Sequence, residues 1–499
     1  MRRPALMLAL LIAAAALAPA ASSARTTRVT TDAQLTAALA AAAPGDTIQL
    51  APGAYASVTI TGRGGAGADL TLAGEVGTTL SGMTITGSQR IVLTGLGFVP
   101  GAAAASIHVA SSSAITFQGV RLDGGAGGAG ASLDIAASAT GVTIADSTFL
   151  HCSSPYCIRT MSPDVSIVHN TFDELDDSDA VHGFGGGVIR NNHMDHALPH
   201  GGGNHNDFIQ IGAGGPWTID GNWFGVRTGG AASIWLDPIN GGLIHDAVIE
   251  NNVVTGHYAG QYVGIFVGGD GTSAALLPRN ITVINNTVIS GLSNSLRFGR
   301  AYATLPVDQR PLVVNNTGER LLDMCDRIRS GHNVFGVGQA CTSTDVIGNP
   351  HLDATGAPTS ASTLLIDRGD PSAAPPHDYF GFARTVGAPD IGAIEFGAKA
   401  TAPAPAPVKV HARARLVSVR IVRGLRRTVV HVRAGNATRI TVAALRKERI
   451  VARAVHAGPA RTGVRLTLTT PRHGTLVIRV RALGPGGGAV RLITRKARP

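Results

Sequence analysis

Five short segments in the middle of the chain share one pattern that combines basic, amide and aromatic residues at the same position. They read Cys-Ile-Arg-Thr, Ala-Val-His-Gly, Phe-Ile-Gln-Ile, Ser-Ile-Trp-Leu and Gly-Ile-Phe-Val, starting at positions 157, 180, 208, 233 and 264. In a β-strand successive side chains point to opposite faces, so the second residue of each segment would be buried and the third exposed. The exposed set is then Arg159, His182, Gln210, Trp235 and Phe266. Such a column would stack a sugar ring on its aromatic members and form hydrogen bonds with hydroxyl groups.

Acidic residues and a histidine-rich insertion accompany this column. Asp179 and Asp207 stand at matching strand starts, and Asp237 ends the following strand. His205 belongs to the insertion 195–206, and long loops on a rigid scaffold are frequent sites of function. The expected catalytic residues are His182, His205, Asp207, Arg159 and Asp237, and the expected substrate-binding residues are Gln210, Trp235 and Phe266.

Two kinds of cleavage chemistry fit these residues. β-Elimination needs a base for the C5 proton of a uronate and a cation that neutralises its carboxylate. No lysine precedes Lys399, so Arg159, His182 and His205 are the candidates for both tasks. Inverting hydrolysis needs two carboxyl groups about 6.5–9.5 Å apart. Asp179 and Asp207 on neighbouring strands would be only about 4.8 Å apart, so Asp207 with Asp237 is the better pair for hydrolysis.

A metal ion is the one cofactor that the sequence suggests. The acidic run 173–179 could bind Ca²⁺ through Asp176, Asp177 and Asp179, or it could be a solvated turn. Histidines recur at positions 182, 193, 196, 200 and 205, and imidazole suits zinc or iron. Their spacing fits no zinc motif, and polar loop residues are the simpler interpretation.

The segments that position these residues are repeats. A phrase of alternating β-branched residues ending in a large apolar residue recurs at 142–149, 165–172, 188–194, 217–224, 247–254 and 281–288. The final apolar positions are 23, 22, 30, 30 and 34 residues apart, which is typical of a solenoid. The alternation predicts short strands, so each unit would form one coil of a parallel β-helix. The same position of the unit holds Asn170, Asn192, Asn222, Asn252 and Asn286, which we expect to stack as a ladder of amide hydrogen bonds.

These repeats resemble the secreted right-handed parallel β-helix proteins of the pectate-lyase-like superfamily. Residues 43–55, after an Ala-rich segment at 32–42 that predicts a capping helix, resemble the start of such a helix, and residues 365–395 resemble its closing segment. The phrase from His205 to Gln210 is similar to one that recurs in this superfamily. The resemblance implies a fold and a polysaccharide ligand. Polygalacturonase-like and mannuronan-epimerase motifs are missing from the sequence, so the resemblance leaves the reaction open.

The N-terminus predicts export. Residues 1–24 combine Arg2 and Arg3 with an apolar run and a small-residue cleavage site, as in a signal peptide. We therefore expect a secreted or cell-surface protein, in which Cys152 with Cys157 and Cys325 with Cys341 would form disulfides. No later run of about 18 apolar residues predicts a membrane span.

The C-terminal region has a different composition. Residues 409–499 contain 22 Lys and Arg and one acid, so the remainder has 42 − 22 = 20 bases and 32 − 1 = 31 acids, and the net charges are +21 and −11. This segregation argues against a uniform nucleic-acid binder, and no specific nucleic acid is expected. Seven alternating segments predict a small β-sandwich. Its charge predicts attraction to a cell-envelope polyanion, although the acidic body could neutralise it, or a GC-rich genome could favour arginine.

The sequence therefore predicts an all-β chain, a right-handed parallel β-helix followed by a small Arg-rich β-sandwich. The expected parts are a signal peptide at 1–24, the β-helix with its cap and closing segment at 25–396, a Pro/Ala linker at 397–408 and the basic domain at 409–499. The expected function is binding and cleavage of an acidic polysaccharide by β-elimination. A non-catalytic glycan-binding or adhesion protein, and a polysaccharide hydrolase or epimerase, remain as alternatives.

Overall fold

A computed structural model describes most of residues 24–499. The segments outside the description are 100–104, 125–130, 153–154, 177, 199–206, 226, 229–231, 256–257, 260–262, 290–293, 385–386, 398–414, 424–426, 436–438, 447–448, 458–463, 470–474, 485–486 and 497–499. The predicted signal peptide and most of the predicted linker therefore lie outside the described residues.

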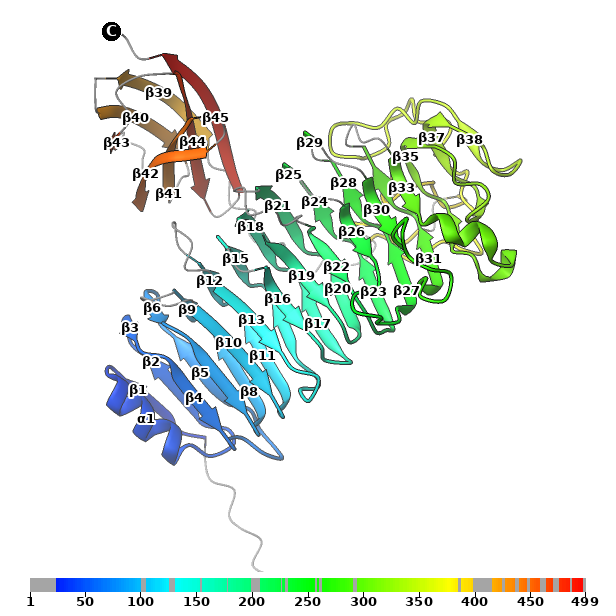
Figure 1. The fold of residues 1–499 in the computed structure, drawn as a ribbon. Coiled ribbons are helices and arrows are strands. Elements are labelled where there is room, and N and C mark those ends of the chain that lie inside the picture. The colour runs from blue at the N-terminus through cyan, green and yellow to red at the C-terminus, as the bar shows by residue number, and fades with distance from the viewer. Residues whose placement is uncertain are drawn as a thin grey trace, which may run out of the picture.

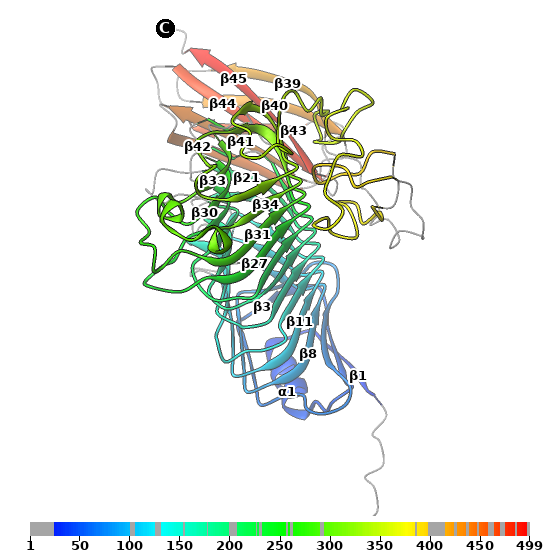
Figure 2. The ribbon, with the colours of Figure 1, turned by 90° about the vertical axis from the view of Figure 1, so that its right-hand side faces the viewer.

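The first part of the chain is a right-handed parallel β-helix built from three sheets (Figures 1 and 2). Sheet A has 13 strands, in spatial order β1 (Thr26–Val29), β2 (Thr47–Leu50), β5 (Leu70–Gly74), β8 (Gln89–Thr94), β11 (Ser113–Gln118), β14 (Thr143–Ala145), β17 (Val165–Val168), β20 (Gly187–Arg190), β23 (Trp217–Asp220), β27 (His245–Glu250), β31 (Arg279–Ile284), β34 (Leu312–Val314) and β36 (Arg329–Gly331). Every pairing runs one coil forward in sequence, as the repeats predicted.

Sheets B and C complete each coil. Sheet B has 15 strands: β3 (Gly53–Tyr55), β6 (Thr78–Leu80), β9 (Gly97–Phe98), β12 (Arg121–Asp123), β15 (Thr148–Leu150), β18 (Thr171–Asp176), β21 (His193–Leu198), β24 (Trp223–Phe224), β28 (Val253–Val254), β32 (Thr287–Val288), β35 (Thr317–Leu321), β37 (Val334–Gly338), β38 (Val346–Ile347), and beside them β25 (Arg227–Thr228) and β29 (Tyr258–Ala259). Sheet C has 10 strands: β4 (Val58–Thr61), β7 (Met83–Thr86), β10 (Ala105–Ala110), β13 (Ala131–Ile135), β16 (Tyr156–Thr160), β19 (Asp179–Gly183), β22 (Ile209–Ile211), β26 (Ala232–Leu236), β30 (Val263–Val267) and β33 (Asn294–Phe298).

The apolar core runs along the inside of the coils, because alternate strand residues from all three sheets point inward. Equivalent positions stack from coil to coil: Phe149 lies on Phe172 with ring centroids 4.7 Å apart and the planes 10° from parallel. Both rings are fully buried. No coil could bury its apolar face alone, so the stacking of coils supplies the core.

The predicted asparagine ladder is confirmed and is longer than predicted. The Asn222 side chain donates to Asn252 Oδ1 at 3.0 Å and accepts from the Asn192 amide at 2.9 Å. The ladder also includes Asn170, Asn286, Asn316 and Asn333. Each buried amide thereby satisfies its own polar atoms and donates to a backbone carbonyl of the preceding coil, as Asn222 does to Ile189, which fixes the register of successive coils.

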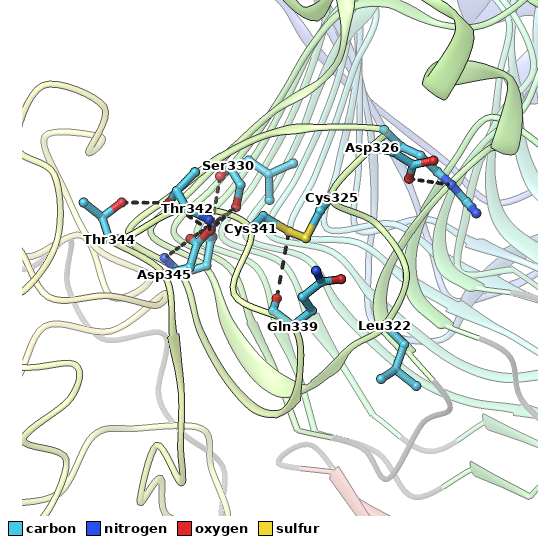
Figure 3. Close-up of a disulfide and its surroundings, with 12 residues drawn as sticks. Leu322, Cys325, Asp326, Ser330, Gln339, Cys341, Thr342, Thr344 and Asp345 are labelled. Atoms are coloured by element: carbon cyan, nitrogen blue, oxygen red, sulfur yellow. Dashed lines mark hydrogen bonds and ion pairs between the residues drawn. A yellow bond between two sulfur atoms is a disulfide. The ribbon is translucent and has the colours of Figure 1, made fainter.

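Both ends of the helix are covered. The predicted capping helix is α1 (Asp32–Ala41), whose N-terminus is capped by the Thr31 hydroxyl. At the other end, short 3₁₀ helices η1 (Arg300–Thr304) and η2 (Val307–Gln309) interrupt the coils. The predicted disulfides Cys152–Cys157 and Cys325–Cys341 are both formed, the second in the last coils (Figure 3).

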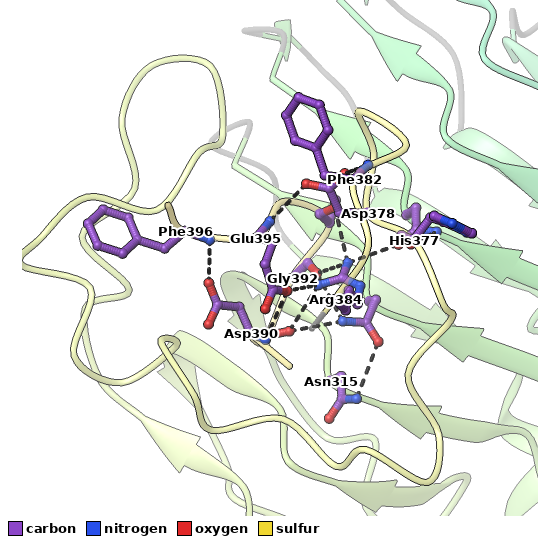
Figure 4. Close-up of polar contacts among 12 residues, drawn as sticks. Asn315, His377, Asp378, Phe382, Arg384, Asp390, Gly392, Glu395 and Phe396 are labelled. Atoms are coloured by element: carbon purple, nitrogen blue, oxygen red, sulfur yellow. Dashed lines mark hydrogen bonds and ion pairs between the residues drawn. The ribbon is translucent and has the colours of Figure 1, made fainter. Parts of the chain in front are cut away.

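The closing segment 348–397 folds back along the outside of the helix, at the corner between sheets A and B. Arg384 is buried and pairs with Glu395 at 2.7 Å (Figure 4). It also donates to Asn251 Oδ1 at 3.0 Å. Asn285 and Asn315 donate to backbone carbonyls of the same segment. Asn251, Asn285 and Asn315 all have positive φ, which asparagine tolerates, so this second asparagine column faces outward and anchors the closing segment.

The C-terminal domain is the predicted β-sandwich. One antiparallel sheet contains β39 (Arg415–Arg423), β40 (Arg427–Gly435) and β43 (Val464–Thr469), and the other contains β41 (Arg439–Arg446), β42 (Arg449–Ala457), β44 (Thr475–Gly484) and β45 (Gly487–Lys496). Its core contains Val430, Val432, Ile440, Val442, Leu468, Ile478 and Val480. Among the described residues, no helix has the length and apolar character needed to cross a membrane.

Candidate functional site

The outer face of sheet C carries the column predicted from the sequence. Arg159 is the strand partner of His182, His182 of Gln210, Gln210 of Trp235, and Trp235 of Phe266. The column continues to Asp134 on one side and Arg297 on the other. The predicted register is therefore confirmed, and five coils present one side chain each to the same face.

A second set of residues joins this face at the strand starts. In β16 and β19 two consecutive residues are buried, Cys157 with Ile158 and Ala180 with Val181. The residues before them, Tyr156 and Asp179, are strand partners and contact the outward side chains Arg159 and His182. These two strands therefore bring a second residue each to this face.

Arg159 is fixed as a cation. Its Nε and one terminal nitrogen donate to the two oxygens of Asp134, both at 2.7 Å. These hydrogen bonds raise the pKa of Arg159 above its ordinary value, so Arg159 cannot act as a base. About a third of the side chain is exposed (34%), and the guanidinium lies 5.3 Å from the Tyr156 ring centroid. Because Asp134 already occupies Nε and one terminal nitrogen, the other terminal nitrogen is the donor that Arg159 could offer to a ligand carboxylate.

His182 is held by an aspartate of its own strand. Its Nδ1 lies 3.4 Å from Asp179 Oδ2, and its ring stacks on Phe184 at 4.7 Å. The Tyr156 ring meets it edge-on at 6.1 Å. A carboxylate beside Nδ1 favours the tautomer with its proton there, which puts the lone pair on Nε2, an atom that is buried in this structure. Tyr156, Arg159 and His182 thus place a hydroxyl, a cation and an imidazole on one face.

The aromatic end of the column forms a second part of the face. Trp235 is half-buried and stacks on Phe266 at 5.5 Å, and the Arg297 guanidinium lies 5.2 Å from the Phe266 ring centroid. Arg297 also forms an ion pair with Asp270. Gln210 and Phe266 are each 7% exposed, so Trp235 and Arg297 provide most of the accessible surface here.

The other three predicted catalytic residues are Asp207, Asp237 and His205. Asp207 is fully buried and accepts the Ala232 amide hydrogen at 2.7 Å, while its own amide donates to Asp179. Asp237 accepts from the Gly269 amide and the Thr272 hydroxyl at 2.8 and 2.7 Å. These contacts suit structural roles. His205 lies outside the described residues.

The structure describes only part of the predicted calcium site, and it shows another group of possible metal ligands on sheet B. Asp177 and the Asp176 side chain lie outside the description, and both Asp179 oxygens contact protein groups. Asp173, Asp195 and His196, on sheet B, instead bring one ligand atom each to within 4.8 Å of one another. One imidazole and two carboxylates match a first-row metal better than Ca²⁺, which prefers six to eight oxygen ligands. We therefore assign no step of the chemistry to Ca²⁺.

A buried charged triad near this set was not predicted. His151 is 1% exposed, with Nδ1 2.7 Å from Asp123 Oδ1 and Nε2 in contact with Glu174. Burial lowers the pKa of His151, but the hydrogen bonds with Asp123 and Glu174 outweigh this and raise it to about 9. His151 is therefore an imidazolium at neutral pH that ties three successive coils together.

Tyr156, Asp134 and Arg297 are the other residues of the face that the sequence reasoning missed. Tyr156 occupies the alignment position of Asp179, so extending the aligned segments towards the strand starts would have found it. Asp134 and Arg297 extend the column by one coil at each end. Their segments, Ser-Leu-Asp-Ile at 132–135 and Ser-Leu-Arg-Phe at 295–298, follow the same pattern and could have been aligned with the five.

No protein-family model and no curated protein matches this chain. Among solved structures, it is similar to the PL6 family alginate lyase AlyGC, with 15% identity and a TM-score of 0.37 over 71% of this chain and 60% of that one. It thus spans less than two thirds of that lyase. It is also similar to the PL6 family polysaccharide lyase Pedsa3628 from Pseudopedobacter saltans, with 14% identity and a TM-score of 0.39 over 67% and 88% of the two chains. The tailspike protein of E. coli bacteriophage HK620 aligns over 93% of this chain at 10% identity and a TM-score of 0.35. We therefore base the function on the residues of this chain.

Proposed function

We propose that the outer face of sheet C binds an acidic polysaccharide and cleaves it by β-elimination. One observation carries the proposal: Arg159 and His182 are strand partners, and each is held by its own aspartate. The reaction needs a carboxylate neutraliser and a base on the same side of the sugar. Preorganised charged groups of this kind stabilise the charge that develops during the reaction.

The proposed steps use only residues of this face. The Arg159 guanidinium binds the uronate carboxylate and makes the C5 hydrogen more acidic. His182 Nε2 takes that proton once a shift of the ring exposes this buried atom, and the C5–H electron pair forms the C4–C5 double bond. The C4–O4 bond breaks, and its oxygen receives a proton from the Tyr156 hydroxyl. Asp179 orients the imidazole and stabilises its protonated form.

The remainder of the column holds the chain on either side of the cleaved bond. Trp235 offers an accessible indole and Arg297 a cation two coils further on, with successive coils about 4.8 Å apart. A polymer lying along the helix axis would contact them one after another. We also propose that the protein meets this polymer outside the cell, because the N-terminal sequence has the pattern of a signal peptide.

A glycan-binding protein without activity is the second candidate, because the same column would bind a glycan without turnover. Hydrolysis has less support, since Asp207 and Asp237 both bond to neighbouring backbone or hydroxyl groups.

The test is incubation of the full chain with a panel of uronate polymers, including alginate and polygalacturonate, while ultraviolet absorbance of unsaturated ends is recorded. An increase on at least one polymer is the expected result. Binding without any increase would favour the non-catalytic alternative, and reducing ends without absorbance would favour hydrolysis.

A further inference from the structure

The C-terminal sandwich concentrates positive charge on an ordered scaffold. Residues 409–499 contain 19 Arg, three Lys and one acidic residue, Glu448. Buried valine, leucine and isoleucine side chains form the domain's own core. Among the arginine and lysine side chains of this domain the structure describes Arg420 and Arg465, and both lie on strands of the sandwich.

One exposed row of this domain is described in detail. Arg420 on β39 is the strand partner of His431 on β40, and His431 is the partner of Arg465 on β43. All three side chains are exposed. Two strand spacings place the backbones of Arg420 and Arg465 about 10 Å apart. The row crosses the whole three-stranded sheet and presents two guanidinium groups to solvent on one face.

We propose that this face binds the same acidic polysaccharide that the β-helix is proposed to cleave. The proposal takes its polymer class from the proposed function. Each uronate of such a polymer carries a carboxylate, and arginine binds carboxylates in a fork geometry. A linear polyanion lying across the strands would meet Arg420 and Arg465 in succession. Phosphate polymers and nucleic acid are alternative polyanions, which the experiment below separates from a polyuronate.

The negative charge of the remaining chain explains why a basic binding surface would help the protein to bind a polyanion. Residues 1–408 have a net charge of 20 − 31 = −11, so long-range forces repel a polyanionic substrate from the β-helix. The basic domain reverses that repulsion on the same chain. Once a polymer is bound there, further binding on sheet C becomes intramolecular and takes place at a high effective concentration.

The test compares two double variants of the full chain that each remove two positive charges. The first is Arg420→Gln with Arg465→Gln. The control is Arg28→Gln with Arg190→Gln, two exposed β-helix arginines that pair with Glu75 and Asp220. Both are made in a His182→Gln background, so that the polymer stays intact, and thermal unfolding verifies that each variant folds. Binding of labelled alginate, polygalacturonate, neutral dextran and a DNA duplex is measured at several salt concentrations.

The expected result is polyuronate binding that weakens with added salt, no binding to dextran, and roughly a 5-fold loss of affinity in the first variant. The control should lose less than about twofold. Equal losses in both variants would overturn the proposal, because net charge alone would then explain binding. Tighter binding to DNA than to either polyuronate would also overturn it. These outcomes are independent of turnover, so they remain readable if no unsaturated ends form in the activity assay.

Discussion

At the scale of single residues, the chemistry of each group is set by a neighbour one coil away or in the same strand. Asp134 holds Arg159 as a fixed cation, and Asp179 orients His182. Tyr156 contacts the His182 ring and the Arg159 guanidinium. It lies outside the aligned segments from which those two residues were predicted. The proposed proton donor can therefore be removed without changing the other two groups.

Tyr156→Phe keeps the ring and removes only the hydroxyl. We expect kcat to fall about 100-fold with KM nearly unchanged, because general acid catalysis typically contributes 10²–10⁴-fold. Steady-state kinetics on the polymer found active in the panel would measure this. Tyr379→Phe, which removes a hydroxyl from the closing segment, is the control and should keep full activity. An unchanged kcat in Tyr156→Phe would exclude this residue as the acid.

The His151 triad makes a pH-dependent contribution to stability. The pKa of His151 is about 9 in the folded protein and about 6.5 when unfolded, so folding is favoured most below pH 6.5 and the benefit disappears as pH rises to about 9. The full contribution is on the order of 3 kcal/mol. Chemical unfolding of the wild type and of His151→Gln should show a stability difference that shrinks over this range. The exposed pair His245 and Asp246 provides His245→Gln as a control, and a pH-independent difference in His151→Gln would contradict the assignment.

At the scale of elements, the asparagine ladder specifies how coils stack. Asn222→Ala would leave the Asn192 side chain without its acceptor and the Ile189 carbonyl without its donor. We expect a loss of about 2–3 kcal/mol in the free energy of unfolding, measured with urea. Thr218→Ala, an outward position on β23, should change stability by less than about 0.5 kcal/mol. Equal effects would mean that the ladder is not the reason for the asparagines.

A second titrating group, Glu250, lies on β27 and feels the charge of Arg384 in the closing segment. Burial, and then the nearby Asp220, raise the pKa of Glu250 to about 7, while Arg190 and Arg384 oppose the shift. An acid with a raised folded pKa destabilises the fold as pH rises from about 4.5 to 7. Glu250→Gln should therefore be more stable than wild type at pH 8 by about 1 kcal/mol, after allowance for partial exposure, and equal to it near pH 4.

Glu75→Gln is a control for which the expected change in stability has the opposite sign. Arg28 lowers the pKa of Glu75, so that substitution should cost stability above pH 5. Thermal unfolding at several pH values measures both variants. Destabilisation of Glu250→Gln at pH 8 would show that its carboxylate is stabilised in the folded protein.

Most of the scaffold could be predicted because its side-chain period is two and its coils repeat. The register of the sheet C column followed from the central Ile or Val of each aligned segment, and the ladder followed from asparagine at one position of the unit. The Asp173, Asp195 and His196 set was missed for a physical reason. His151, Glu174 and His196 have positive φ at equivalent points of successive coils. This conformation interrupts the alternation of inward and outward side chains on which the sequence prediction depended. The burial of Asp207 was not predicted because the alternation of residues within one strand does not show which segments cover the outer face of that strand.

At the scale of the whole molecule, an acidic β-helix and a basic sandwich are joined on one chain. The charge partition and the shared face of Arg159 and His182 are evident from the sequence, whereas the place of the Tyr156 hydroxyl beside them needed the structure. The proposed cleavage site occupies the early coils of the column, and the aromatic contacts continue along the helix axis.

The central claim is that turnover occurs on sheet C, and two histidines allow a direct test. His182 lies on sheet C beside Asp179, and His193 lies on sheet B, stacked on Trp223 at 4.2 Å. The measurement is the rate of unsaturated-end formation by wild type, His182→Gln and His193→Gln on the active polymer, with folding verified by thermal unfolding. We predict that His182→Gln loses at least about 100-fold in kcat and that His193→Gln stays within about threefold of wild type. Full activity in His182→Gln, or loss confined to His193→Gln, would contradict the account and place the reaction on another face.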